Sequence, residues 1–333
     1  MKFEKWQALG NDYLILERDE LAFELTPARI RKLCAPHFGV FADGVLLLSH
    51  SADPEVVADL RIYNPDGSEA ELSGNGAREA ILYLRRRGWT EHDSFAIDTA
   101  AGRIRPQITG RDTCRVDMGR ASLASKDFPG GASDGRGELA GAHFQHVSIG
   151  NPQCAIHVSD LATLQALDLP AIGPAIEGHA LFPNRTNVSW YTEIGVAEGN
   201  AAGSVEGETA EPAGGEVAES ARGEVAEPAG GEAFAADAPP RARIRARIFE
   251  RGVGETLSSG TGATGAAIAY ALQSTGVPAS VLVELDGGEL QVDLDADLRV
   301  HLTGWARPVF TGCLSEDFIA ELCETKPPSE GAA

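Results

Sequence analysis

Residues 71–78 read ELSGNGAR, and residues 257–264 read LSSGTGAT. Aligned on Ser73 and Ser259, the two stretches become S-G-N-G-A-R and S-G-T-G-A-T, and a run with helical composition follows each one. In both places, strand-like segments lead into the glycine-rich loop. A chain that repeats strands, loop and helix in this way predicts two similar α/β domains, each a strand layer wrapped around one central helix.

The rest of the chain has an α+β pattern in which hairpins outnumber strand–helix–strand units. The runs that predict strands are residues 12–18, 44–49, 56–64, 95–109, 114–119, 144–158, 185–194, 241–252, 279–285, 289–295 and 298–304. Helices are expected at 26–38, 74–88, part of 161–178 and 260–276. The two helices that follow the loops are expected to be apolar on one side, through Ala80, Ile81 and Leu84 in the first and Ala267, Ile268 and Ala271 in the second.

One segment has the composition of a disordered acidic insertion. Residues 196–240 repeat the unit GEVAEPAGGE with variations and contain nine Glu, one Asp and one Arg, a net charge of −9 out of −21 for the chain. Low hydrophobicity with high charge cannot offset the entropy lost on ordering. The segment is expected to join two strands; an interaction tail is the alternative. We expect one domain from 1–117 plus 306–333 and a second from 118–305.

Composition excludes several classes of protein. The net charge of −21 and the pI near 4.7 argue against nucleic acid and an anionic membrane surface as partners. Five cysteines without a C-x-x-C pair predict reduced thiols in the cytoplasm rather than a disulfide framework. No signal peptide or membrane helix is expected. Without a cofactor signature or a histidine pair at metal-binding spacing, neither a cofactor nor a metal is expected.

The twin loops are candidate anion sites. A helix N-terminus exposes unpaired N–H groups and partial positive charge, and glycines let a ligand approach closely. Neither loop matches a P-loop, a dinucleotide fingerprint or a G-x-S-x-G elbow. The plain alternative is that both are only helix caps. If the loops face one another, they could hold one carboxylate, and Ser73 and Ser259 would flank the neighbouring carbon from opposite faces.

Five motifs in this order resemble the diaminopimelate epimerase family, whose members are pyridoxal-independent isomerases. They are ALGNDYLIL (8–16), IYNPDGSEAELSGNGAR (62–78), SIGNPQCAIHV (148–158), FPNRTNVSW (182–190) and FERGVGETLSSGTGA (249–263). The resemblance covers the chain except the acidic insertion and the last dozen residues. It implies two similar domains with an active site in the cleft between them, no cofactor, and a homodimer.

The resemblance also implies the site residues. Ser73 and Ser259 stand at the catalytic positions, and the loop residues Gly74, Asn75, Gly260 and Thr261 are expected to contact the substrate. The further implied contacts are Asn11, Asn64, Asn151, Asn187, Glu250 and Arg251. These types suit a substrate with an amino-acid group at each end, because Asn offers donors and acceptors, Glu250 can take an ammonium and Arg251 can grip a carboxylate. Turn or cap roles for each Asn, and a solvated Glu250–Arg251 pair, are the alternatives.

Two kinds of position depart from the family pattern. The family has cysteines, which act as base and acid, where this chain has Ser73 and Ser259; a thiol near pKa 8.5 is far more acidic than an aliphatic hydroxyl. Gln153 stands where His is more common, and Gly44 where Gln is frequent. Three interpretations follow: inversion of L,L-diaminopimelate to the meso form by a serine pair, a related amino-acid racemase or dehydratase, or a catalytically silent diaminopimelate-binding relative.

Overall fold

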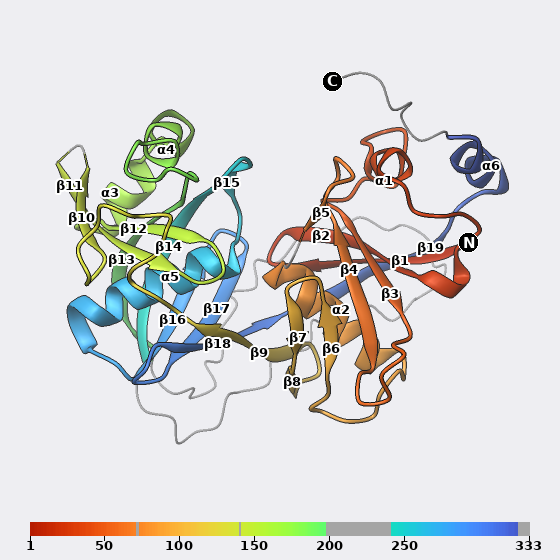
Figure 1. The fold of residues 1–333 in the computed structure, drawn as a ribbon, viewed down its shortest axis with the longest axis horizontal. Coiled ribbons are helices and arrows are strands. Elements are labelled where there is room, and N and C mark those ends of the chain that lie inside the picture. Colours follow the sequence, from red (N-terminus) through yellow and green to blue (C-terminus); the bar gives the residue numbers. More distant parts are fainter. Residues whose placement is uncertain (71–72, 140, 198–240, 326–333) are drawn as a thin grey trace, which may run out of the picture.

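The computed structural model describes residues 1–70, 73–139, 141–197 and 241–325, which form two domains side by side (Figure 1). The insertion predicted at 196–240 lies outside the described residues, except for its first two, which end a strand. The strands on either side of it, β13 (Asn187–Ala197) and β14 (Arg241–Glu250), pair in antiparallel fashion. The fold is the predicted α+β arrangement of two similar domains.

The first domain is an eight-stranded sheet around α2 (Gly74–Arg86). Its strand order is β19-β1-β2-β3-β4-β6-β7, with β5 paired to β4. The strands are β1 (Lys2–Ala8), β2 (Asn11–Glu17), β3 (Val45–Ser49), β4 (Ala58–Tyr63), β5 (Glu69–Ala70), β6 (Ile97–Thr99), β7 (Gly102–Ile104) and β19 (Arg307–Cys313). A 3-10 turn (Arg18–Glu20), α1 (Pro27–Cys34) and α6 (Glu316–Glu324) lie outside this sheet.

The second domain is an eleven-stranded sheet around α5 (Gly260–Tyr270). Its order is β10-β11-β12-β13-β14-β16-β17-β18-β9-β8, with β15 paired to β14. The remaining strands are β8 (Gln107–Gly110), β9 (Thr113–Arg120), β10 (Arg136–Leu139), β11 (Ala142–Ser148), β12 (Pro152–His157), β15 (Gly254–Thr256), β16 (Ala279–Leu285), β17 (Gly288–Leu294) and β18 (Arg299–Trp305). A π-helical turn (Ala271–Thr275) extends α5, and α3 (Leu161–Ala166) and α4 (Leu169–Glu177) connect β12 to β13.

The two sheets repeat one pairing pattern. In the first, β1–β2 is antiparallel, β2–β3 parallel, β3–β4 antiparallel and β4–β6 parallel. In the second, β11–β12, β12–β13, β13–β14 and β14–β16 follow the same sequence of directions. In each domain a short strand pairs with the fourth strand of this pattern and leads into the central helix: β5 pairs with β4, and β15 pairs with β14. The two glycine-rich loops therefore occupy equivalent places in the two domains.

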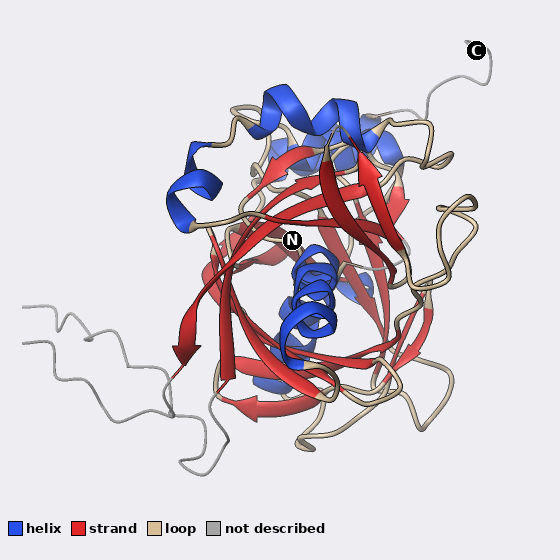
Figure 2. Cartoon of the chain, turned by 90° about the vertical axis from the view of Figure 1, so that its left-hand side faces the viewer, coloured by secondary structure: helices blue, strands red, loops and turns tan. Residues whose placement is uncertain are grey.

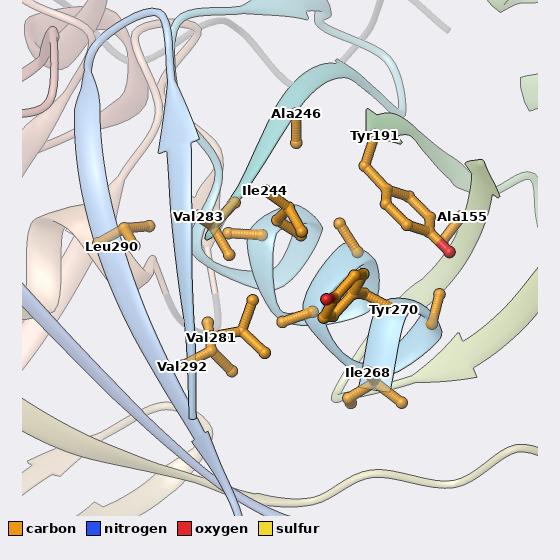
Figure 3. Close-up of a cluster of buried hydrophobic side chains, with 14 of the residues drawn as sticks. Ala155, Tyr191, Ile244, Ala246, Ile268, Tyr270, Val281, Val283, Leu290 and Val292 are labelled. Carbon is orange, nitrogen blue, oxygen red and sulfur yellow. The ribbon is translucent and has the colours of Figure 1, made fainter. Parts of the chain in front are cut away.

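The central helices are buried on all sides, so the prediction of one apolar face for each was too narrow. All residues from Asn75 to Leu84 of α2 are buried, as are all those of α5 except Thr261. Viewed from the end of the second domain, a helix runs inside a ring of strands (Figure 2). Its alanines let strand side chains such as Ile244 and Val283 pack closely around it (Figure 3). A helix enclosed by sheet needs small side chains, because neighbouring backbones approach from every direction.

Several predicted elements differ in detail. The run 95–109 forms three short strands, separated by a turn at Ala100 and Ala101 and a break at Arg105 and Pro106, and 161–178 splits where Asp168 caps a new helix. β1, β10, β19 and α6 were not predicted. The β1 pattern is obscured by a register shift between Lys5 and Trp6 that breaks the alternation of buried residues.

The chain crosses between the sheets twice, from β7 to β8 and from β18 to β19. The predicted limit at 117/118 falls inside β9, which pairs with β18 of the second sheet. Cys114 and Val116 of this strand nevertheless pack in the core around α2. β9 thus belongs to the sheet of the second domain and contributes side chains to the core of the first. The predicted domain limits remain a prediction.

A hairpin turn also joins the two cores. Leu9 and Gly10, between β1 and β2, have positive φ angles of 57° and 83°. Leu9 is fully buried, and its side chain packs in the core of the second domain. Left-handed backbone costs a leucine roughly 1–2 kcal/mol, which the burial of its side chain offsets. The turn therefore fixes the first domain, and Asn11 beside it, against the second.

We expect Leu9→Ala to destabilise the chain by about 2–5 kcal/mol, because it empties a buried site and keeps the backbone cost. Leu161→Ala, at a site that is 39% exposed on α3, is the matched control and should change stability by less than about 1 kcal/mol. Urea unfolding of both variants checks this. Equal effects would contradict the role of Leu9 in joining the domains.

Candidate functional site

Ser73 and Ser259 are the N-caps of α2 and α5. The Ser73 hydroxyl accepts a hydrogen bond from the Gly76 amide at 3.1 Å, and the Ser259 hydroxyl accepts one from the Gly262 amide at 3.2 Å. Both serines have extended backbone angles, as N-cap residues do. The two hydroxyls therefore lie at equivalent places, each over the first turn of a buried helix.

The two helices meet at their N-termini. A Cβ atom built on Gly260 would lie 3.8 Å from the Cα of Gly74, and one on Gly74 would lie 3.7 Å from the Cα of Gly260. Even a methyl group at either glycine would be in van der Waals contact with the other helix, so the two helix ends lie against one another. The structure thus brings the two predicted loops together, at the junction of the domains.

Positive charge concentrates at this junction. Arg78 is fully buried, and its Nη1 lies about 4 Å from the Cβ positions of both glycines. It donates to the Gly74 carbonyl at 3.0 Å and to Asn75 Oδ1 at 2.5 Å, while its Nε has no partner among the described residues. Burial lowers the pKa of Arg78. Two helix N-termini and a guanidinium without a bonded carboxylate favour an anion at this place.

Ser259 has a carboxylate partner. Its hydroxyl donates to Glu250 Oε2 at 2.9 Å, and Thr256 donates to Glu250 Oε1 at 2.9 Å. Burial raises the pKa of Glu250, and the two hydroxyl donors oppose that shift. A carboxylate in this position can accept the serine proton when the serine itself accepts one.

Ser73 has a phenol partner instead. The Tyr13 hydroxyl donates to Ser73 Oγ at 3.2 Å. Burial raises the pKa of Tyr13 well above its usual range, and the nearby Glu79, Asp43 and Glu250 add to the rise. The phenol is therefore protonated at neutral pH.

Asn75 links the two domains. Its Nδ2 donates to Ser258 Oγ at 2.9 Å and to Asn11 Oδ1 at 3.4 Å. Asn11 in turn donates to Asp43 at 2.8 Å. The predicted residues Asn11 and Asn75 thus lie together, on either side of the helix junction.

The other predicted residues form two further pairs. Asn151 donates to Thr261 Oγ1 at 3.3 Å and accepts from Gln153 at 2.6 Å, so Gln153 holds Asn151 in place. Asn187 accepts from the Arg251 amide at 2.8 Å, and the exposed Arg251 side chain donates to the Asn184 carbonyl at 2.9 Å.

Asn64 stands apart from the other predicted contacts. It donates to Ser68 Oγ at 2.9 Å, within its own turn. Among the described residues no hydrogen bond connects it to the rest of the predicted set.

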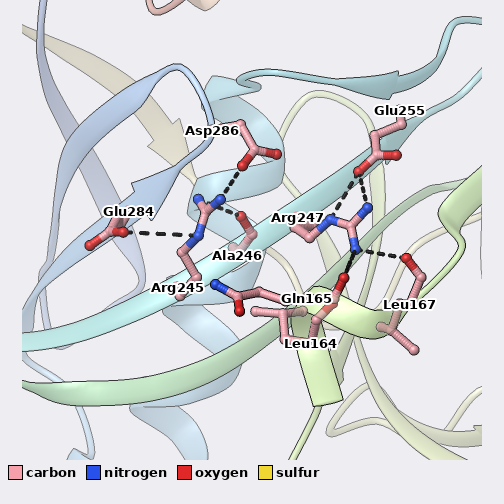
Figure 4. Close-up of polar contacts among 9 residues, drawn as sticks. All are labelled: Leu164, Gln165, Leu167, Arg245, Ala246, Arg247, Glu255, Glu284 and Asp286. Atoms are coloured by element: carbon pink, nitrogen blue, oxygen red, sulfur yellow. Dashed lines mark hydrogen bonds and ion pairs between the residues drawn. The ribbon is translucent and has the colours of Figure 1, made fainter. Parts of the chain in front are cut away.

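An arginine holds the loop that carries Ser259. Arg247 of β14 donates to Glu255 of β15 and to the carbonyls of Leu164, Gln165 and Leu167 at the end of α3 (Figure 4). The neighbouring Arg245 pairs with Glu284 and Asp286. The strand predicted at 241–252 is confirmed over Arg241–Glu250, with arginines on one face, and Arg247 ties β15 to the end of α3.

Sequence reasoning missed five polar residues at the junction: Tyr13, Asp43, Arg78, Thr256 and Ser258. All but Asp43 lie within one of the quoted motifs, which is the only signal that could have found them, and Asp43 has no such signal. Their contacts bridge up to 183 residues of sequence, as between Asn75 and Ser258. Distances of this kind are not readable from local pattern.

Glu79 is a buried carboxyl next to this cluster. It is fully buried on α2, and neither of its oxygens has a hydrogen-bond partner among the described residues. Burial raises its pKa well above the usual range, and Asp12 and Asp43 add to the rise, while Arg78 opposes it. Burial in the folded chain therefore favours the neutral form of Glu79.

Comparisons with known proteins define the class. The model of the family described as diaminopimelate epimerase matches residues 3–124 and 194–308. Diaminopimelate epimerase 2 of Nostoc sp. is 32% identical over 96% of this chain and 98% of its own, and the diaminopimelate epimerase of Pelotomaculum thermopropionicum is 33% identical over 94% and 98%. A phenazine biosynthesis protein of the PhzF family from Bacillus anthracis, 17% identical, shares the fold with a TM-score of 0.61 over 94% and 98% of the chains.

The fold and these relatives define an enzyme of the isomerase type. The chain belongs to the diaminopimelate epimerase family. Within the described ranges, no helix has the length and apolarity to cross a membrane, and no three His, Cys, Asp or Glu side chains cluster as metal ligands would.

Replacing Glu79 with Gln should change how stability depends on pH. The folded chain keeps a proton on Glu79 that the unfolded chain releases above about pH 4.3. The contribution of Glu79 to the free energy of unfolding therefore falls as pH rises, until the carboxyl of the folded chain also ionises. Glu79→Gln should therefore gain stability relative to wild type between pH 4 and 8, by at most about 1.4 kcal/mol per pH unit. Urea titrations at several pH values measure this, with the exposed Glu91→Gln as control. Parallel pH curves would contradict a neutral buried Glu79.

Proposed function

We propose that this enzyme inverts one α-carbon of L,L-diaminopimelate to give the meso form, in the cytoplasm and without pyridoxal phosphate. The product serves lysine and peptidoglycan precursor synthesis. One observation carries the proposal: two N-cap hydroxyls stand at helix ends that meet, and one of them is hydrogen-bonded to a partly buried carboxylate. That arrangement suits proton removal on one face of a carbon and proton return on the other.

The substrate α-carboxylate would bind at the meeting point of the helices. There it would accept hydrogen bonds from the first-turn amides, and Arg78 beneath would add positive charge. Removing the α-proton spreads negative charge into that carboxylate. Preformed positive charge stabilises this developing charge more than it stabilises the ground state. The same feature that binds the substrate therefore lowers the barrier for carbanion formation.

Proton transfer would run through the serines. Ser259 can take the α-proton while its own proton passes to Glu250 Oε2, so that no free alkoxide is needed on this face. This replaces the acidity that a thiol would supply. The proposed distal contacts are Arg251, Asn187, Asn151 and Asn64, which would hold the second amino-acid group. Glu250 is already bonded to Ser259 and Thr256, so we assign it to proton transfer rather than to the distal ammonium.

The first test is α-proton exchange. We expect the purified chain in deuterium oxide to exchange the α-proton of L,L-diaminopimelate and to form the meso isomer, both followed by NMR. Ser259→Ala and Glu250→Gln should each lower the rate by 100-fold or more, because each removes a member of the proton path. Ser73→Ala should abolish inversion.

The outcomes separate the alternatives. Binding of diaminopimelate without exchange would overturn the proposal in favour of a silent relative. Exchange with another amino acid only, or water loss instead of inversion, would point to a racemase or a dehydratase. Ser73→Cys/Ser259→Cys is the matched control for the scaffold: a rate far above wild type would show that only the hydroxyls limit turnover.

We propose further that the chain forms a homodimer through β19, the open edge of the first sheet. Val309 and Phe310 on this strand are 53% and 45% exposed. Phe310 pairs in register with Lys5, whose ammonium lies over the ring of the exposed Phe41. An exposed apolar edge strand is a template for pairing, and a second copy presents the same surface.

Val309→Lys should therefore weaken the dimer, because it places a charge on the edge. Sedimentation equilibrium should give twice the chain mass of 35.0 kDa for wild type and a value closer to one chain for the variant. Leu161→Lys, on an exposed helix of the second domain, should leave the dimer intact. A monomeric wild type would contradict the proposal.

A further inference from the structure

The two cap serines have unequal hydrogen-bond partners. The Ser73 oxygen accepts twice, from the Gly76 amide and from the Tyr13 phenol, so its own proton is free to be given away. The Ser259 oxygen accepts once, and its proton is held by Glu250. One hydroxyl is arranged as a proton donor and the other as a proton acceptor.

The partner of Ser73 is suited to donating. The ring of Tyr13 is buried beside α2, where a Cβ on Gly76 would lie 3.3 Å from it. The charged and titratable groups that face the phenol are Glu79 of α2, Asp43 of the loop before β3 and Glu250 of β14. The negative charges of Asp43 and Glu250 disfavour a phenolate in the resting enzyme. Tyr13 therefore holds its proton and directs it at Ser73 Oγ.

We propose that Tyr13 is a positioning residue for Ser73 and gives the two faces fixed roles in the resting enzyme: Ser259 removes the proton and Ser73 delivers it. This inference rests on the proposed function and adds a group outside the predicted site. In this proposal the acid and the base are not equivalent: the Glu250 carboxylate assists Ser259 on one face of the substrate carbon, and the Tyr13 phenol assists Ser73 on the other.

The proton balance closes through water. The α-proton moves to Ser259 Oγ as the Ser259 proton moves to Glu250, and the bonding electron pair remains on the substrate as the carbanion. That pair then takes the Ser73 proton on the opposite face, and the Tyr13 proton follows to Ser73 Oγ. Glu250 is left neutral and Tyr13 as phenolate, with total charge unchanged. Water takes the proton from Glu250 and returns one to Tyr13.

The test is Tyr13→Phe, which removes the phenol oxygen and keeps the ring. L,L- and meso-diaminopimelate are each incubated with the full chain in deuterium oxide, and α-proton exchange and inversion are measured separately. We expect one isomer, whose α-proton faces Ser259, to keep exchanging within about threefold of wild type while its inversion falls tenfold or more. The other isomer should lose both exchange and inversion. KM should stay within about twofold.

Two sets of control variants test whether the effect of Tyr13→Phe arises from its contact with Ser73. Ser73→Ala should give the same partition, and the double variant should add nothing, because both changes break one relay. Tyr83→Phe removes a different buried phenol, which lies on the far part of α2 and is hydrogen-bonded to Glu17 of β2, and it should leave both rates unchanged. Equal loss of exchange and inversion with both isomers of Tyr13→Phe, or no loss, would overturn the inference and leave the proposed function standing. An inactive wild-type chain would overturn both.

Discussion

The contact between the N-termini of α2 and α5 is the constraint on which the rest of the molecule depends. Two helix dipoles meet at their positive ends, with Arg78 buried beneath them. Such an arrangement is unfavourable unless the surrounding structure imposes it. Each helix is enclosed by its own sheet, and the Leu9 turn and the shared strand β9 lock the two sheets together. Packing across two domains thus stabilises a positive junction that neither domain would form alone.

For the proposed chemistry, the consequence is that the fold compensates for the low acidity of a serine hydroxyl. Neither hydroxyl is acidic by itself, but each stands at a helix end and each is hydrogen-bonded to an ionisable side chain. The partners differ, Glu250 for Ser259 and Tyr13 for Ser73. The two domains therefore repeat one backbone pattern around the junction but differ in the hydrogen-bond partners of their cap serines.

Much of the fold and part of the candidate site could be predicted from the sequence, and the features that were not predicted have physical explanations. The repeated loops, both central helices and most central strands follow from apolar runs and glycine placement. β19 was not predicted because it contains Pro308 and mostly exposed residues, a pattern that is atypical of a strand but tolerated at the edge of a sheet. The serine caps were predicted, but the Tyr13 contact joins residues 60 positions apart. Likewise, the sequence marks Glu79 only as one more helical residue, although the fold leaves it buried without a partner.

The pairing of β1 with β19 has a consequence for how the protein is made. β1 is synthesised long before its outer partner β19, which follows about 300 residues later along the chain. Until then the first sheet ends at β1, with a row of unpaired amide and carbonyl groups facing water. The first sheet is therefore complete only after β19 has been synthesised. Until then the open edge of β1 is a surface that chaperones could shield, and loss of β19 would damage the domain whose other strands are synthesised first.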